Sequence, residues 1–133
     1  AKRAIELDKP ILGICAGFNN LLRAIGSDVL SDKTGSHNHL DIKYRHHIKI
    51  NKDSKLYNII HQEDIQVNSI HSMIATKELV EPYAKITSYS DDETIESFEL
   101  PDKKFVMGIK WHPELMLEDE FPNNLFRVLI SKC

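Results

Sequence analysis

Apolar residues in this chain form short groups with two different spacings. Residues 11–14 are an apolar run without polar alternation, which is typical of a strand covered on both faces, as in a parallel sheet. Residues 18–25 then place apolar side chains at helical spacing, and Gly26 is expected to end that helix. Residues 1–7 predict the end of an earlier helix. The pattern therefore predicts a strand, a tight turn at residues 15–17 and a helix.

The later pattern adds a group of strands and a closing helix. A polar surface loop is expected at 27–47, and a short helical turn at 56–60. Pro122 is expected to open the last helix, because proline suits the first helical turn. Strands are expected near residues 45–50, 65–69, 84–89, 94–100 and 105–111. Helices alternating with strands predict an α/β fold.

Composition narrows the class of protein. The 133 residues have 41% hydrophobic content and a net charge of -3. The chain has no basic stripe of the kind that indicates nucleic-acid binding. None of its apolar runs approaches the ~20 residues that span a bilayer. Two distant cysteines, Cys15 and Cys133, fit a reducing cytoplasm rather than a disulfide framework. Because the chain begins at Ala1 within a helical pattern, we expect further chain upstream.

Cys15 lies at the predicted turn between strand and helix, flanked by Gly13 and Gly17. A nucleophile at such a turn is lifted out of the sheet, and glycines allow close passage of the chain. The following helix N-terminus is expected to lower the thiol pKa, and the Ala16 amide can donate to a developing oxyanion. A buried structural cysteine beside packing glycines would show the same sequence at residues 13–17. The motif alone therefore leaves a catalytic and a structural role of Cys15 both open.

A second polar group follows the last predicted strand, in the segment Trp111-His112-Pro113-Glu114. A cysteine nucleophile needs a base, and a third polar group orients that base. His112 is placed at the end of a strand, where open α/β sheets carry active sites. Glu114 is two residues further on and can reach back to the imidazole. The alternative interpretation is that His112 only caps a loop. The presence of the cysteine turn in the same chain favours the catalytic interpretation of His112.

These segments together resemble the class I glutamine amidotransferase superfamily, in its gamma-glutamyl hydrolase-like branch, the C26 cysteine peptidases. The resemblance rests on residues 9–17, 44–50, 67–72, 94–99 and 111–114. It implies a flavodoxin-like three-layer α/β/α sheet, incomplete at the N-terminal side, with residues 1–133 forming its C-terminal part. It also implies hydrolysis of gamma-glutamyl amide bonds through a thioester, without a cofactor.

The resemblance also implies roles for single residues. Cys15 would attack the amide, His112 would transfer the proton, and Glu114 would orient His112. Four further residues would lie at the substrate: Ala16, Asn19, Ser69 and His71. Two departures from the family pattern concern this group. Glutamine is usual at the position of Asn19, and a larger residue at that of Ala16.

Two other interpretations remain. One is a non-catalytic remnant or half-protein, which would need an upstream partner or form a homo-oligomer, because the family's first strands and second oxyanion donor come from upstream. The other is a zinc site built from four histidines, His37, His39, His46 and His47. Their spacing matches no structural zinc pattern, so a histidine-rich surface loop is favoured and no metal is expected.

Overall fold

A computed structural model describes residues 1–41 and 43–133. The helices are α1 (Lys2–Glu6), α2 (Ala16–Ala24), α3 (Lys55–Ile60), α4 (Lys77–Val80), α5 (Glu120–Ser131) and the 3₁₀-helix η1 (Pro113–Leu115). The strands are β1 (Ile11–Ile14), β2 (Leu30–Ser31), β3 (His46–Ile50), β4 (Asp64–Val67), β5 (Met73–Ile74), β6 (Lys85–Ser90), β7 (Ile95–Glu99) and β8 (Val106–Ile109).

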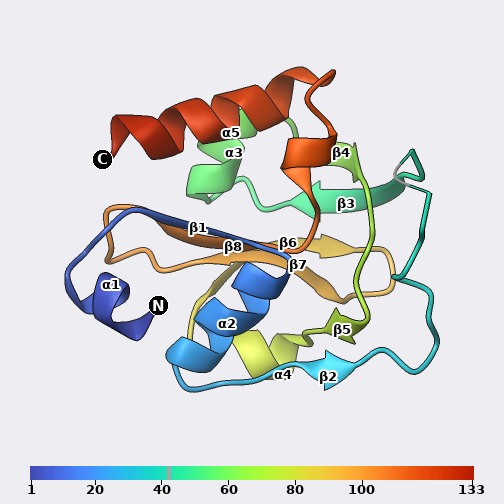
Figure 1. The fold of residues 1–133 in the computed structure, drawn as a ribbon, viewed down its shortest axis with the longest axis horizontal. Coiled ribbons are helices and arrows are strands. Elements are labelled where there is room, and N and C mark those ends of the chain that lie inside the picture. The colour runs from blue at the N-terminus through green and yellow to red at the C-terminus, as the bar shows by residue number, and fades with distance from the viewer. Residues whose placement is uncertain (42) are drawn as a thin grey trace.

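Six strands form one curled sheet in the order β1-β8-β7-β6-β3-β4 (Figure 1). β1 pairs in parallel with β8, and the other neighbours in this sheet are antiparallel. The parallel pair aligns Ile14 with Ile109, so both strands end at the same edge. That edge carries the candidate site. β2 and β5 form a separate two-stranded sheet.

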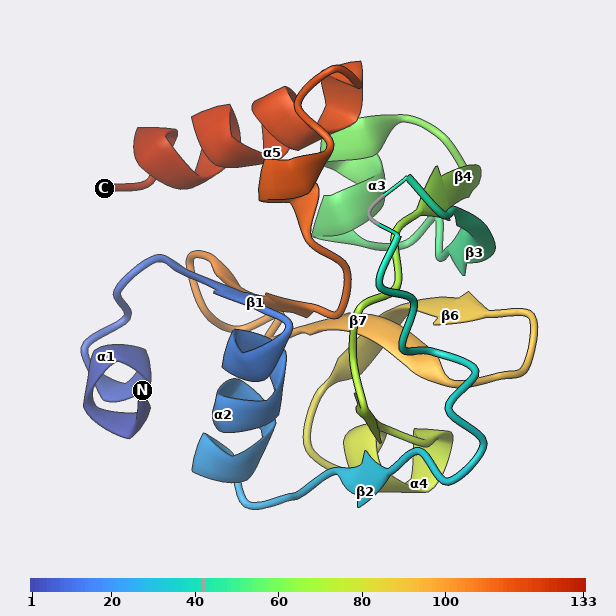
Figure 2. The ribbon, with the colours of Figure 1, turned by 45° about the vertical axis from the view of Figure 1, so that its right-hand side comes forward.

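Helices cover both faces of the large sheet, which gives the flavodoxin-like three-layer α/β/α arrangement (Figure 2). α3 and α5 lie on one face, and α2 and α4 lie on the other. A hydrophobic core lies on each face of the large sheet. Strand β8 contributes to both cores, because successive side chains of a strand point to opposite faces. Met107 and Ile109 join the core under α3 and α5, while Val106 joins the core under α2.

Local sequence explains where α3 and α5, the two helices on one face of the large sheet, begin and where α3 ends. The Ser54 hydroxyl accepts a hydrogen bond from the Tyr57 amide at 3.0 Å, which caps the start of α3. α3 ends at Ile60, and the next residue, His61, caps it in a left-handed conformation. α5 begins at Glu120, two residues before the expected start at Pro122. Proline is tolerated there because the first-turn amides have no partner within the helix.

The main strands follow the expected pattern, and the exceptions are short elements. β2, β5 and α4 were not expected, because two to four residues carry too little periodicity. The last strand ends at Ile109 rather than Trp111. The expectation that residues 27–47 form a surface loop is wrong for His37, which is 5% exposed. α5 has 12 residues, and no helix in the described ranges is long and apolar enough to cross a membrane.

Candidate functional site

Cys15 forms a sharp turn between β1 and α2. Its backbone has φ 54° and ψ −98°, a conformation that non-glycine residues rarely adopt. The turn is held on both sides: the Cys15 amide donates to the Ile109 carbonyl at 2.8 Å, and the Asn19 amide donates to the Cys15 carbonyl at 3.3 Å. The structure therefore confirms a strained strand-to-helix turn at the cysteine, with Ala16 as the first residue of α2.

The two glycines beside the cysteine differ in their packing. A Cβ atom on Gly13 would lie 2.6 Å from the Gly17 carbonyl oxygen and 2.6 Å from a Leu21 methyl carbon. A Cβ atom on Gly17 would meet nothing within 4 Å. Close chain passage therefore requires glycine at residue 13, whereas the structure shows no steric need for glycine at residue 17.

The Cys15 thiol is partly buried, and its Sγ lies 3.7 Å from the Ile70 carbonyl oxygen. Burial raises the pKa of this thiol, and its effect outweighs the Lys110 charge and the Ala16 amide, both of which lower the pKa. The expected lowering of the Cys15 pKa is therefore wrong for this structure. A thiol in this state needs a base to become a nucleophile.

His112 and Glu114 form the pair expected from their spacing. His112 Nδ1 lies 2.8 Å from a Glu114 carboxylate oxygen, and both side chains remain accessible to solvent. His112 follows β8 and precedes η1. Because β1 and β8 are parallel neighbours, Cys15 and His112 both leave the sheet at its carboxyl edge. Within the described residues, no hydrogen bond joins the Cys15 thiol to His112.

Asn68 fixes the backbone of His112, a role that sequence reasoning missed. Its Oδ1 accepts from the His112 amide at 2.7 Å, and its Nδ2 donates to the His112 carbonyl at 2.9 Å. Asn68 follows β4 and is fully buried. A buried carboxamide must find partners, so an asparagine after an apolar strand was the available signal.

The other residues expected at the substrate are engaged in contacts within the chain. Ser69 is buried and donates to the His37 carbonyl at 2.8 Å. His71 Nδ1 lies 2.8 Å from the Met73 carbonyl oxygen. The Asn19 carboxamide oxygen accepts from Lys110 Nζ. Their substrate roles stay predictions, and Ser69 and His71 lie on either side of Ile70, which contacts the Cys15 thiol.

Lys110 is a second residue that sequence reasoning missed. It is 1% exposed, its Nζ donates to the Met73 carbonyl at 3.0 Å, and it lies 4.8 Å from the Phe18 ring centre. Burial lowers the pKa of Lys110 to about 8, against the attraction of Cys15 and Glu96. A lysine within the apolar run 105–111 was its signal. Lys110 therefore places a cation close enough to the Cys15 thiol to affect its pKa.

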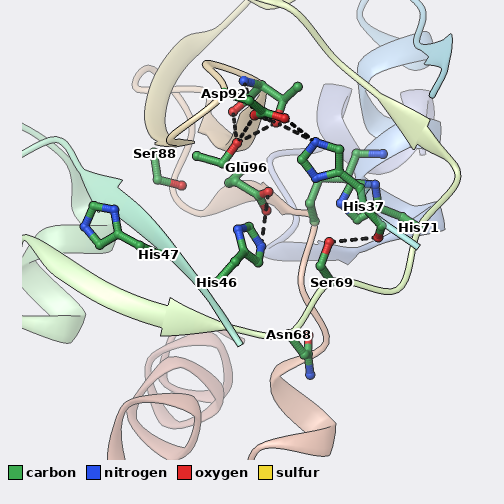
Figure 3. Close-up of polar contacts among 12 residues, drawn as sticks. His37, His46, His47, Asn68, Ser69, His71, Ser88, Asp92 and Glu96 are labelled. Atoms are coloured by element: carbon green, nitrogen blue, oxygen red, sulfur yellow. Dashed lines mark hydrogen bonds and ion pairs between the residues drawn. The ribbon is translucent and has the colours of Figure 1, made fainter. Parts of the chain in front are cut away.

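The four histidines considered as a zinc site do not meet. His39 stacks on Tyr44, and His47 contacts two exposed aspartates through both ring nitrogens. His37 and His46 instead approach each other inside the protein, with ring centres 6.2 Å apart. Figure 3 shows these two rings beside Glu96, with His47 apart from them.

Glu96 is the buried carboxyl group of this region. It is 1% exposed, and burial raises its pKa to about 8. Burial also lowers the pKa of the neighbouring His71 to about 3, with a further contribution from Lys110. Among the residues that the structure describes, His71 Nε2, Glu96 Oε1 and His46 Nε2 have no hydrogen-bond partner, although the last two lie 3.6 Å apart. Each such buried group costs about 1–3 kcal/mol, so the cluster lowers stability unless a ligand satisfies it.

Comparison with known proteins identifies relatives of this chain. The peptidase C26 family model matches residues 1–114. A glutamine-hydrolyzing GMP synthase component from Archaeoglobus fulgidus is 30% identical over 128 residues, covering 96% of this chain and 64% of that protein. The gamma-glutamyl-gamma-aminobutyrate hydrolase PuuD of Escherichia coli K12 is 24% identical over 144 residues, covering 98% of this chain and 56% of that protein.

The fold has counterparts among solved structures. A glutamine amidotransferase from Thermotoga maritima superposes with a TM-score of 0.64 at 17% identity, covering 96% of this chain and 57% of that one. This likeness shows the fold. The chain spans 64% of the length of the GMP synthase component and 56% of that of PuuD.

Proposed function

This chain belongs to the peptidase C26 family of glutamine amidotransferase-like proteins, and we propose that it hydrolyses gamma-glutamyl amide bonds with Cys15 as the nucleophile. One observation carries the proposal. The strained cysteine turn and the His112–Glu114 pair lie at the same carboxyl edge of two adjacent parallel strands. This is where open α/β sheets place catalytic groups.

The chemistry assigns one role to each residue. His112 accepts the thiol proton as Cys15 Sγ attacks the substrate's gamma-carbonyl carbon. The Ala16 amide donates to the oxyanion. His112 then returns the proton to the leaving amine as the carbon–nitrogen bond breaks, which leaves a thioester on Cys15. Water activated by His112 hydrolyses that thioester, releasing the gamma-carboxylate and restoring the thiol.

Glu114 supports this cycle through the other ring nitrogen. With Nδ1 turned toward Glu114 at 2.8 Å, the proton of neutral His112 resides on Nδ1 and Nε2 is the free base. The carboxylate also stabilises the imidazolium that forms after proton transfer. The raised pKa of the Cys15 thiol makes this base necessary.

The substrate class rests on the relatives. PuuD is named a gamma-glutamyl-gamma-aminobutyrate hydrolase, and the GMP synthase component is named glutamine-hydrolyzing. Free glutamine and small gamma-glutamyl amides are therefore the substrates we propose. Both Cys15 and Cys133 are free thiols, which fits a reducing cytoplasm.

Turnover assays test the proposal. The purified protein is incubated with glutamine or gamma-glutamyl-gamma-aminobutyrate, with added hydroxylamine to capture the acyl group as a hydroxamate. We expect glutamate and hydroxamate from the protein and its Cys133→Ser variant, and none from Cys15→Ser. Equal turnover by the Cys15→Ser variant would contradict the proposal.

A second candidate is that this chain needs another polypeptide for activity. β1 is an edge strand of the described sheet, and its free edge offers backbone groups for pairing. We therefore propose that an upstream half, or a second copy of the chain, pairs there and completes the oxyanion site. The same assay decides this point, with and without a co-expressed upstream segment of a relative. Full turnover by the chain alone as a monomer would exclude it.

A further inference from the structure

His37, His71 and Glu96 bring three metal-ligand atoms within 4.8 Å of one another in the interior of the protein. All three side chains are at most 7% exposed. They come from three segments: the loop before β3, the segment after β4, and strand β7. Figure 3 shows the two imidazoles and the carboxylate gathered in one place.

The outer contacts of these histidines orient the remaining ring nitrogens. His71 turns Nδ1 to the Met73 carbonyl at 2.8 Å, so Nδ1 carries the proton and Nε2 keeps a lone pair. His37 turns Nε2 to the Asp92 carboxylate at 2.6 Å, which leaves Nδ1 as its ligand atom. Metal-binding histidines commonly hold a carbonyl or a carboxylate in this way.

Three buried polar atoms at this cluster make no hydrogen bond within residues 1–41 and 43–133. His71 Nε2 and Glu96 Oε1 make no hydrogen bond, although both are buried. His46 Nε2 is also without a hydrogen bond and lies 3.6 Å from Glu96 Oε1. Buried polar atoms are normally satisfied, so an unpartnered group of this kind indicates a ligand.

We propose that His37, His71 and Glu96 bind one divalent transition-metal ion, with Zn²⁺ as the favoured species. Two imidazoles and a carboxylate are an established zinc donor set, and imidazole also suits the neighbouring first-row metals. Atoms no more than 4.8 Å apart can surround a point roughly 2.8 Å from each. The His37 and His71 rings are stacked nearly parallel, with centres 5.1 Å apart, so binding would turn one ring until both lone pairs face the ion. His46 Nε2 lies 3.6 Å from Glu96 Oε1, at the border of this group.

Charge and access are compatible with a cation. Asp92 supplies a carboxylate, and Glu96, whose pKa burial raises to about 8, supplies a second one when a bound cation displaces its proton; the ammonium group of Lys110 also faces this region. A cavity of about 180 Å³, lined in part by His37, His46 and Asp92, brings solvent to the His37 side of the cluster. The bound ion would tie the His71 segment, including the Ile70 carbonyl beside the Cys15 thiol, to β7. The metal-binding test below measures the ion alone, so its outcome is separate from that of the hydrolysis assay.

Metal stoichiometry tests the inference. The protein is stripped with a chelator, equilibrated with Zn²⁺, desalted and analysed for metal, and the affinity is measured by calorimetry. We expect one ion per chain. Glu96→Gln and His71→Gln should weaken binding by more than about 100-fold, since even outer partners contribute about 10–100-fold. Asp92→Asn, which changes only such an outer partner, should weaken it by about 10–100-fold.

Matched variants separate this site from others on the chain. His39→Gln and His47→Gln change partly exposed histidines outside the cluster, and Cys15→Ser removes the nearby thiol, so all three should bind as the wild type does. Loss of binding in any of them, or unchanged binding in Glu96→Gln, would overturn the proposal. So would a wild-type protein that retains no stoichiometric ion.

Cobalt absorption keeps the test decisive if a buried variant fails to fold. Co²⁺ bound to the wild type should show ligand-field bands without a thiolate charge-transfer band. Absence of ligand-field bands, or presence of the thiolate band, would count against the His37, His71 and Glu96 ligand set.

Discussion

The side chain of Asn68 holds the backbone of His112 by two hydrogen bonds, one to its amide and one to its carbonyl. The two residues are 44 positions apart in sequence. The proposed base is therefore positioned by a buried carboxamide from the segment after β4, in addition to its contact with Glu114. In the proposed reaction Asn68 would act through His112, which makes it a positioning residue.

Replacing Asn68 by alanine should destabilise the protein and displace His112. Two backbone groups lose their partners, which we expect to lower the free energy of unfolding by about 2–4 kcal/mol. Urea denaturation measures this change, and His112 NMR shifts report the displacement. Asn58→Ala is the matched control, because Asn58 is exposed on α3. A loss no larger than that of the control would show that Asn68 does not support His112.

Alanine at the two glycines beside the nucleophile should act in opposite directions. Gly13→Ala places a Cβ atom 2.6 Å from backbone, and we expect about 1–3 kcal/mol of destabilisation from overpacking. Gly17→Ala enters open space within α2 and should stabilise by up to about 1 kcal/mol. Thermal or urea unfolding compares the pair. Equal losses at both positions would contradict the packing described for this turn.

Removing the Glu114 carboxylate should reduce turnover while leaving the fold intact. Glu114 is partly exposed, so its replacement by glutamine removes little packing. We expect kcat to fall by about 10²–10⁴-fold, because the tautomer and imidazolium of His112 lose their support. Steady-state kinetics should show the loss in kcat rather than in KM. Glu118→Gln, at an exposed glutamate, is the control, and unchanged kcat in Glu114→Gln would exclude the proposed role.

The Lys110 charge should set how readily the Cys15 thiol ionises. Lys110 lowers the thiol pKa, in opposition to burial. Lys110→Met removes that attraction, so the pKa should rise further and less thiolate should be present at neutral pH. Alkylation of Cys15 by iodoacetamide should slow several-fold there, and its pH profile should move to higher pH. Lys104→Met, on the turn before β8, should leave the profile unchanged.

Short-range features were predictable because neighbouring residues determine them. The apolar run 11–14 and the helical spacing after Cys15 predicted the strand, turn and helix that position Cys15. The spacing of His112 and Glu114 predicted their contact, since two residues across a proline cannot lie far apart. The family resemblance rests on the same local segments, and the match over residues 1–114 confirms it.

The tertiary structure alone decided the features that join distant segments. Three features depend on segments that are distant in the sequence and come together only in the fold. They are the sheet order, the hydrogen bonds of Asn68 to the His112 backbone and the buried position of Lys110. The histidines show this best. Spacing grouped His37 with His39, but the fold buries His37 and brings it to His71 and Glu96, up to 59 residues away. Local periodicity carries no information on such contacts, because they form only when the core of the sheet packs.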